Sequence, residues 1–336
     1  MSGHRGVLTA VRLDGREARA VEQAALQLAA GKLVAFPTET VYGLGARADD
    51  DHAVEQIFAA KGRPTEHPLI VHVAEPADAL LFTPRVPVLA QRLMDAFWPG
   101  PMTVVVRRTE GVATAAAGGL ATIALRCPAH PVALSLLAAC KRLGVPGLAG
   151  PSANAFGRLS PTRADHVIAE FGADLVVLDG GDCQVGIESS IVDCSGHQPV
   201  LLRPGILTRE RIESVVGQTL QDADDASPRA PGTLAAHYAP RAKVRVMPAT
   251  MLKTALEMLG PAPVKLAVYS RSLPAGIAPG VLHQRMPLRP DAAAHELFAA
   301  LREFDAQDVQ LIWVEEPPTD DAWDGVRDRL QRAAGS

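Results

Sequence analysis

Residues 33–45 read LVAFPTETVYGLG and place a dense group of polar side chains directly after a short apolar run. The apolar run 33–36 predicts a buried strand that ends at Pro37. Loops that follow strands are where α/β proteins hold their ligands. Two threonine hydroxyls, a carboxylate and two glycines suit a small polar substrate, so residues 37–45 form a candidate binding loop. A plain polar turn is the alternative.

On both sides of this loop, helical periodicities and short apolar runs follow one another without strict alternation. Such interleaving indicates an α/β fold with a mixed sheet rather than a purely parallel one. The predicted helices cover residues 17–30, 51–60, 86–97 and 130–143. The predicted strands cover residues 33–36, 68–73, 102–108, 121–126, 145–150, 174–179, 189–193 and 199–205.

The composition of the sequence changes near residue 218, where a polar stretch containing two prolines begins. We therefore expect a first domain over residues 1–217, a linker over 218–241 and a smaller α/β domain over 242–336. In the second domain a helix separates successive strands, which is typical of a small parallel sheet with crossovers. Its predicted strands are 243–248, 265–270 and 309–314, and its predicted helices are 249–259, 291–307 and 321–333.

The bulk composition excludes several classes of protein. A net charge of −4 gives no global attraction for a polyanion, so we expect no stable complex with tRNA. No apolar stretch approaches the roughly 18 residues of a membrane span, and the N-terminus lacks a signal-like apolar core. The cysteines are spaced too widely for a CxxC pair. We expect a cytoplasmic protein with reduced thiols, no membrane anchor and no metal held by protein side chains.

Several basic and polar clusters can bind an anionic substrate. Lys61 and Arg63 flank a glycine, and together they offer a point charge and a two-pronged grip on phosphate. Ser152 and Asn154 are separated by one residue, so an extended backbone would point both to one face. The alternative for Lys61 and Arg63 is a solvated pair on the surface, and the alternative for Ser152 and Asn154 is an ordinary polar loop. No Walker-type phosphate loop occurs, so an ATP site here would be of another kind.

Taken together, these clusters resemble the YrdC-like family of threonylcarbamoyl-AMP synthases in its two-domain form. The resemblance runs in order through PTETVYGLG, KGRP with PLIVHV, FWPGPMT, PSAN with SPT, GIESSIVD and LLRPG, over residues 17–210. The segment APGTLAAHYAP (230–240) is similar to the linker of the two-domain members. Each motif alone is common, whereas their order and spacing are specific. The implied fold is a twisted mixed sheet around a positively lined cavity, followed by a small Rossmann-like domain.

The resemblance also implies roles for individual residues. The four implied catalytic residues, which contact the ATP phosphates, are Lys61, Arg63, Ser152 and Asn154. The positions implied to hold L-threonine are Thr40, His72, Arg126, Gly150 and Ser189. The further positions implied to contact ATP are His67, Thr122, Ser160, Arg203 and Tyr238. Two positions depart from the family pattern. His67 stands where many members have asparagine, and this departure concerns one nucleotide contact. Phe156 stands where a small residue is common, and we expect this second departure to affect only local packing.

The implied reaction joins L-threonine, bicarbonate and ATP, with Mg²⁺ accompanying the ATP, and yields threonylcarbamoyl-AMP and pyrophosphate. The implied partners downstream are the proteins that transfer the threonylcarbamoyl group to tRNA. We further expect the segment 230–240 to fold over the ATP site as a lid, although a plain tether is the alternative. Two rival functions are a hydrogenase-maturation carbamoyltransferase, whose CxxC motifs are missing here, and an RNA-binding module, which the low aromatic content of 4% disfavours.

Overall fold

The stretch 33–45 forms two antiparallel strands joined by its polar loop. In the computed structural model, which describes residues 11–172, 175–259, 265–274 and 278–335, β2 (Val34–Phe36) pairs with β3 (Gly43–Arg47). Residues 1–10, on which the expectation of no signal segment rests, lie outside this description. We did not predict β3, because its glycines indicated a loop. A Cβ at Gly45 would lie 3.0 Å from the Phe36 ring, so glycine here lets that ring pack flat on the strand.

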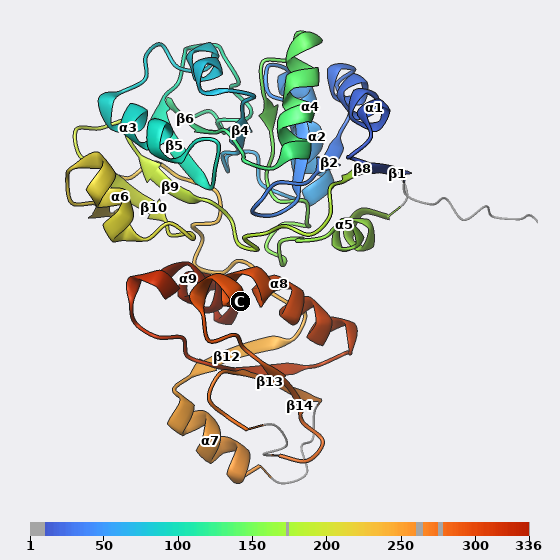
Figure 1. The fold of residues 1–336 in the computed structure, drawn as a ribbon, viewed down its shortest axis with the longest axis vertical. Helices are drawn as coiled ribbons and strands as arrows, with labels where there is room; N and C mark the ends of the chain where they lie inside the picture. The colour runs from blue at the N-terminus through green and yellow to red at the C-terminus, as the bar shows by residue number, and fades with distance from the viewer. Residues whose placement is uncertain (1–10, 173–174, 260–264, 275–277, 336) are drawn as a thin grey trace, which may run out of the picture.

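The first domain is built on a long mixed sheet covered by helices (Figure 1). Its strands run in the spatial order β1-β8-β2-β3-β7-β4-β6-β5-β9-β10-β11. The remaining strands are β1 (Val11–Asp14), β4 (Ile70–His72), β5 (Met102–Arg107), β6 (Thr122–Arg126), β7 (Leu148–Ala149), β8 (Val176–Asp179), β9 (Ser190–Asp193), β10 (Val200–Arg203) and β11 (Gln221–Asp222). Both parallel and antiparallel pairs occur, which confirms the predicted mixed α/β sheet.

Cap and glycine signals set the ends of some helices in this domain, such as α2 (Asp51–Lys61) and α6 (Arg209–Val216). The other described helices are α1 (Ala18–Ala29), the 3-10 turn η1 (Pro76–Leu81), α3 (Val88–Phe97), α4 (Pro131–Arg142) and α5 (Ala164–Phe171). The α2 helix shows the causes. Its Asp50 side chain accepts hydrogen bonds from the first free backbone amides, and Gly62 ends the helix in the left-handed conformation with φ 61°. This stop fixes Lys61 at the last helical position.

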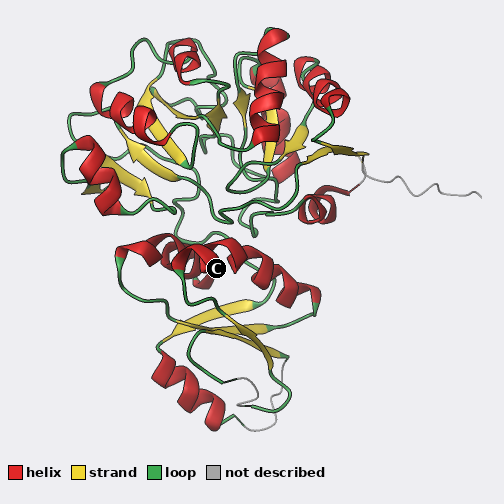
Figure 2. Ribbon diagram, viewed as in Figure 1, coloured by secondary structure: helices red, strands yellow, loops and turns green. Residues whose placement is uncertain are grey.

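The C-terminal domain is a parallel sheet with helices on both faces, as its alternating pattern predicted (Figure 2). The strands lie in the order β12-β15-β13-β14. They are β12 (Lys243–Met247), β13 (Leu266–Ser270), β14 (Leu282–Arg285) and β15 (Leu311–Glu315). The helices are α7 (Ala249–Glu257), α8 (Pro290–Ala306), the 3-10 turn η3 (Asp321–Trp323) and α9 (Asp324–Ala334).

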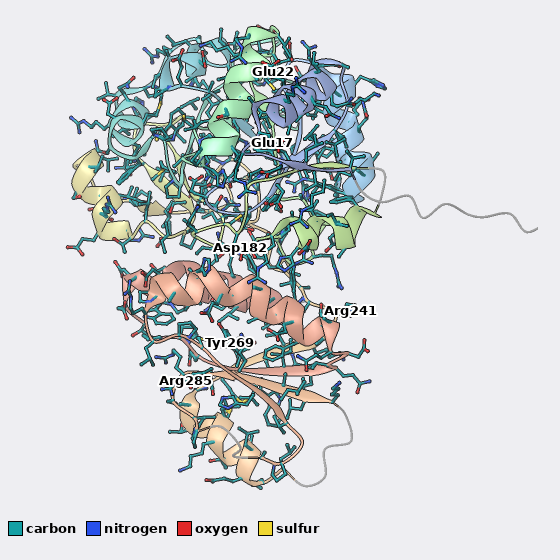
Figure 3. The ribbon with its side chains drawn as sticks, turned by 45° about the vertical axis from the view of Figure 1, so that its right-hand side comes forward. Glu17, Glu22, Asp182, Arg241, Tyr269 and Arg285 are labelled. Carbon is teal, nitrogen blue, oxygen red and sulfur yellow. The ribbon has the colours of Figure 1, made fainter. Side chains whose placement is uncertain are left out.

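Helices α8 and α9 lie between the two sheets, so they form the face that the C-terminal domain turns toward the first domain (Figure 1). A shared apolar cluster crosses this boundary and joins Val41, Leu159 and Ile187 to residues of both helices. At Gly186, where φ is 85°, a Cβ would lie 2.5 Å from the Ala294 carbonyl oxygen. Glycine is therefore required for the close approach of the two backbones. Figure 3 shows Asp182 on the rim of the first domain that faces α8.

In the part of the chain that the structure describes, no helix combines the length and the apolar character that crossing a membrane requires.

Candidate active site

One cavity gathers most of the polar loops found in the sequence. Its lining residues surround about 600 Å³ of non-atom space, which includes space open to solvent, and about 40 Å³ of this can hold the centre of a water-sized sphere. Its wall is built from the loop after β2, the end of α2, the strands β4 and β6, the loop after β7, the end of β10 and the segment 231–238. Because these parts are strand ends and helix termini, a rigid scaffold positions the side chains.

Lys61 and Arg63 stand at the end of α2 and are both buried. The Lys61 ammonium donates to the carbonyl oxygen of Ser152 at 2.6 Å and to that of Asn154. Arg63 donates from Nη2 to the Pro68 carbonyl at 2.9 Å. Burial lowers the pKa of Lys61 well below its ordinary value and that of Arg63 to about 10. An anionic ligand would reverse this effect, because it would supply the missing counter-charge.

The loop after β7 brings Ser152 and Asn154 to the cavity wall, as their spacing predicted. Asn154 is buried, and its side-chain amide donates to the carbonyls of Ala155 and Arg158 at 2.8 and 2.9 Å. The Oδ1 atom of Asn154 has no hydrogen-bond partner. The Lys61 ammonium donates to two backbone carbonyls of the same loop. These hydrogen bonds connect Lys61 directly with Ser152 and Asn154.

A second group of residues lies where β4 and β6 run side by side. His72 and Arg126 face each other in parallel register, and Gly150 lies against the His72 ring. Arg126 donates to the Thr40 hydroxyl at 2.9 Å and to the Glu39 carboxylate at 2.6 Å. Burial, with help from the Arg126 charge, lowers the pKa of His72 to about 3, so its imidazole is neutral at pH 7. Its Nδ1 atom is buried without a hydrogen-bond partner.

A buried carboxylate, that of Glu188, also lies on the cavity wall. Ser160 donates its hydroxyl proton to one carboxylate oxygen, and Arg329 of α9 donates to the other at 2.9 Å. Although burial alone would raise it, the nearby Arg329 and Arg203 charges lower the pKa of Glu188. Arg203 itself donates to the Ser189 carbonyl and to the Pro231 carbonyl. Glu188 is therefore an ionised, fully paired group.

The segment 231–238 closes one side of the cavity with two aromatic rings. His237 packs edge-on against Phe156 and Tyr238, with ring centroids 6.1 and 4.1 Å apart. Tyr238 is buried in the left-handed conformation, with φ 60°. Within the described residues, the His237 Nδ1 atom and the Tyr238 hydroxyl have no hydrogen-bond partner. Burial lowers the pKa of His237 to about 3 and raises that of Tyr238 to about 12.

The electrostatics of the cavity favour an anion with several acceptor and donor groups. Four basic residues line it, against the single carboxylate Glu188 among the described lining residues. Half of the buried side-chain atoms that lack a hydrogen-bond partner in the described chain belong to its wall. Buried polar groups rarely go unpaired, so these atoms indicate where a ligand would bind. The basic residues are Lys61, Arg63, Arg126 and Arg203, and the unpaired atoms belong to His72, Asn154, His237 and Tyr238.

Four of the residues singled out from the sequence do not reach the cavity wall. Ser160 and Ser189 lie one contact behind it, bonded to Glu188 and Arg203. His67 lies behind the Phe156 ring at a centroid distance of 5.4 Å. Thr122 begins β6 and pairs with Arg107 in the sheet. The structure places all the other predicted site residues on the wall: Thr40, Lys61, Arg63, His72, Arg126, Gly150, Ser152, Asn154, Arg203 and Tyr238.

Some lining residues were missed or misjudged from the sequence. We expected Phe156 to affect only local packing, but it lines the cavity, and its ring lies 5.6 Å from the Arg63 guanidinium carbon. Glu188 stood in a recognised polar cluster without an assigned role. The sequence gives no sign of its partner Arg329, because the contact joins two domains and spans 141 residues. The further lining residues are Thr38, Val41, Gly43, Ile70, Pro151, Gly157, Pro231, Gly232 and His237.

The fold and the cavity together define a two-domain α/β protein with a cation-lined site that the interdomain segment covers. The family model described as "Telomere recombination" matches residues 27–205, and the model described as "Threonylcarbamoyl-AMP synthase, C-terminal domain" matches residues 207–335. The chain belongs to the threonylcarbamoyl-AMP synthase family and is an enzyme of the nucleotidyltransferase type.

Relatives and solved structures agree with this assignment. The threonylcarbamoyl-AMP synthase of Pyrococcus abyssi is 39% identical, with 91% of each chain covered. That of Bacillus subtilis is 36% identical, covering 94% of this chain and 93% of the relative. The crystal structure of P. abyssi Sua5 complexed with L-threonine superposes with a TM-score of 0.87 at 35% identity, and 97% of each chain is covered. The predicted fold, a mixed α/β sheet followed by a smaller domain, is thereby confirmed.

Proposed function

We propose that this chain condenses L-threonine, bicarbonate and ATP into threonylcarbamoyl-AMP and pyrophosphate. The observation that carries the proposal is the convergence of four basic side chains and four unpaired buried polar atoms on one cavity. The names of its relatives and the threonine bound in the P. abyssi structure support the choice of substrates.

The amino acid would bind beside β4 and β6. Arg126 is suited to the threonine carboxylate because its guanidinium is already oriented by Thr40 and Glu39. The unpaired Nδ1 of His72 is a hydrogen-bond acceptor for the amine or hydroxyl of threonine. Val41 and Ile70 offer apolar contacts for its methyl group.

ATP would bind along the opposite wall, with its phosphates near Lys61, Arg63, Ser152 and Asn154. Arg203 and Tyr238 would contact the nucleotide beside them, while Ser160 and Glu188 would support that wall from behind. Ser189 would likewise support the threonine side through its contact with Arg203. His67 and Thr122 stay candidate ATP contacts outside the wall.

Mg²⁺ fits this cavity as the counter-ion that ATP brings with it. Within the described ranges no three carboxylate, histidine or cysteine side chains form a metal cluster. Both carboxylate oxygens of Glu188 are already engaged. Ser152 and the free Oδ1 of Asn154 are the neutral oxygens available beside the phosphates. When bound, the ion would neutralise phosphate charge.

The chemistry then requires positioning rather than a covalent intermediate. Bicarbonate gives CO₂ and hydroxide, and the neutral threonine amine adds to the CO₂ carbon. A new N–C bond forms, the amine loses a proton that combines with the hydroxide to give water, and the product is a carbamate. A carbamate oxygen attacks the α-phosphorus of ATP, a new P–O bond forms, and the bond to the β-phosphate oxygen breaks to release pyrophosphate. Lys61 and Arg63 would stabilise charge on the transferring and leaving phosphates. Holding two reactants in line supplies up to about 7–11 kcal/mol of the barrier reduction.

The experiment that tests this function measures pyrophosphate release by the purified full-length protein. We expect release that requires both L-threonine and bicarbonate, with a product that has the mass of threonylcarbamoyl-AMP. Release in the absence of threonine, or ADP as the product, would contradict the proposal. In the cell we expect the reaction in the cytoplasm, with the product passed to the proteins that modify tRNA and without a stable tRNA complex.

A further inference from the structure

Helix α9 of the C-terminal domain reaches the back of the cavity through one side chain, Arg329. This guanidinium belongs to the largest fully buried side chains of the described chain. It donates from Nε to the Glu188 carboxylate at 2.9 Å, from Nη2 to the Glu188 carbonyl at 3.2 Å, and from Nη1 to the Pro204 carbonyl at 2.7 Å. One side chain thus connects α9 to two loops of the first domain.

The same guanidinium also holds the aromatic residue that closes the cavity. Its central carbon lies 5.3 Å from the centroid of the Tyr238 ring, a distance typical of cation–π contacts. On another side the Tyr238 ring packs against Phe298 of α8, with centroids 5.5 Å apart. Two helices of the C-terminal domain therefore hold Tyr238. Its backbone is left-handed, with a φ of 60°, and a residue other than glycine keeps this unfavourable conformation only when its surroundings hold it there.

The backbone that precedes Tyr238 is tied to α9 as well. The His237 amide donates to the Arg332 carbonyl at 3.3 Å, and the Arg332 guanidinium donates to the Leu234 carbonyl. The first domain holds the segment too: Arg203 donates to the Pro231 carbonyl, the Phe156 ring packs against His237, and the Ala239 amide donates to the Gly157 carbonyl at 2.8 Å. The Tyr238 ring itself is held from the side of α8 and α9.

We propose that Arg329 is a positioning residue through which the C-terminal domain holds Glu188 and Tyr238 in the conformation that binds the nucleotide. This inference rests on the proposed function, because it assigns Tyr238 to the nucleotide side of the cavity. Arg329 itself touches no substrate in this arrangement and acts through the carboxylate and the ring. The C-terminal domain thereby becomes a part of the active site.

The test compares Arg329→Gln with a matched control at the same domain boundary. Arg302 of α8 is also largely buried and crosses the boundary to the Leu159 carbonyl and the Glu170 carboxylate, but it does not line or back the cavity. Arg302→Gln therefore loosens the interface without touching Glu188 or Tyr238. Both variants are made in the full-length chain, and their melting temperatures are measured first.

The first measurement is independent of turnover. Hydrogen exchange in peptides covering residues 230–240 should speed up about tenfold in Arg329→Gln, because the hydrogen bonds of this segment open more often. In Arg302→Gln the same peptides should exchange at the parent rate. Equal exchange in the two variants would overturn the proposal, whether or not the protein makes threonylcarbamoyl-AMP.

The second measurement is the affinity for each substrate separately. Calorimetric titration with a non-hydrolysable ATP analogue should show affinity weakened about tenfold in Arg329→Gln, with L-threonine affinity nearly unchanged. A loss of both affinities to the same extent would indicate a general structural defect and would refute the positioning role. Failure of the parent protein to release pyrophosphate would contradict the proposed function alone, since binding and exchange do not depend on the reaction.

A second variant keeps the test decisive if Arg329→Gln does not fold. Arg329→Lys retains the charge opposite Glu188 but loses the planar group over Tyr238 and the simultaneous bond to Pro204. It should fold, exchange faster over residues 230–240 and bind the ATP analogue more weakly. Parent-like behaviour of Arg329→Lys in both measurements would overturn the proposal.

Discussion

Gly150 shows how strongly a single position constrains the threonine side of the cavity. A Cβ at this position would lie 3.0 Å from the His72 Nδ1 atom and 3.2 Å from Phe36 Cζ, which is tighter than ordinary contact. Because His72 is buried and packed edge-on against Phe36, its ring has little room to move away. The need for glycine here follows from the close approach of an imidazole that the proposed function uses.

We therefore predict that Gly150→Ala weakens threonine binding about tenfold and destabilises the fold by about 1–3 kcal/mol, since the added methyl displaces the His72 ring. Affinity for the ATP analogue should change little. Gly196→Ala is the matched control, because no atom lies within 4 Å of a Cβ placed there. Calorimetric titration with threonine measures the effect, and parent-like affinity in Gly150→Ala would contradict it.

Lys61 holds two backbone carbonyls, and the proposed function gives it a catalytic task as well. Lys61→Met should lower turnover by about 10²–10³-fold, as for the loss of one preorganised charge donor, and reduce stability by about 1–3 kcal/mol. The stability loss arises because two buried carbonyls, those of Ser152 and Asn154, lose their donor. Lys253→Met removes an exposed lysine that pairs with the exposed Glu257 and serves as control. Unchanged pyrophosphate release in Lys61→Met would exclude it from the phosphate site.

The choice of amino acid should depend more on the hydroxyl than on the methyl group. Serine lacks one methyl, which is worth about 1–3 kcal/mol in an apolar pocket, so serine should be a poor but measurable substrate. Valine lacks the hydroxyl and would leave buried polar groups unpaired, so it should react far more slowly. Pyrophosphate release with each amino acid at equal concentration tests this ranking. Equal rates for valine and threonine would show that the hydroxyl is not recognised.

At the scale of elements, the sequence predicted the helices and strands that carry strong periodicity. It missed the strands β3 and β11, whose pairing depends on distant contacts, and also the helix α6, although Thr208 and Gly217 cap it locally. The strand β3 was predicted as a loop because it contains two glycines. In the structure these glycines make room for the Phe36 ring of the paired strand and do not form a turn. The short strand β11 lies inside the expected linker and forms only by pairing with β10. Pairing of this kind adds no local pattern, so it is invisible in the chain itself.

The same reasoning explains which part of the site was predictable. The polar loops that carry Thr40 and Ser152 follow predicted strands, so their meeting at one cavity could be foreseen from topology. Lys61 and Arg63 follow a predicted helix, and the strand rule did not place them. The buried pair of Glu188 with Arg329 could not be foreseen, because it depends on how α9 docks against the first domain.

The segment 231–238 makes its own prediction as an element. Tyr238→Ala should weaken binding of the ATP analogue about tenfold and leave threonine binding nearly unchanged, because the ring that closes the nucleotide side is lost. Tyr238→Phe keeps the ring and removes only a hydroxyl that has no partner, so its effect should be much smaller. Comparable losses in both variants, or none in either, would show that the ring does not close the ATP site.

At the scale of the whole molecule, the distribution of charge matters more than its sum. The chain carries a net charge of −4, yet its cavity is lined by four basic residues and one carboxylate. The acidic total argued against a polyanion-binding surface, and the local surplus of cations favours a small anion held inside. Both inferences are compatible because burial confines the field of these cations to the cavity.

Burial of neutral histidines gives the last prediction, which concerns the stability of the whole protein. His72 and His237 line the cavity, and burial lowers the pKa of each to about 3, against an ordinary value of 6.5. The unfolded chain therefore binds protons between about pH 6.5 and pH 3 that the folded protein does not. Their contribution to stability is fully present above pH 6.5 and declines as the pH falls toward 3.

Each of these histidines should lower the free energy of unfolding by about 1.4 kcal/mol per pH unit below pH 6. Urea titrations between pH 7 and pH 4.5 measure this slope. His72→Gln should reduce the slope by about that amount, because one buried proton acceptor is removed. His52→Gln is the control for the substitution itself, since His52 is exposed on α2 and lies outside the cavity. A slope in His72→Gln equal to that of the parent would show that this imidazole is not kept neutral by burial.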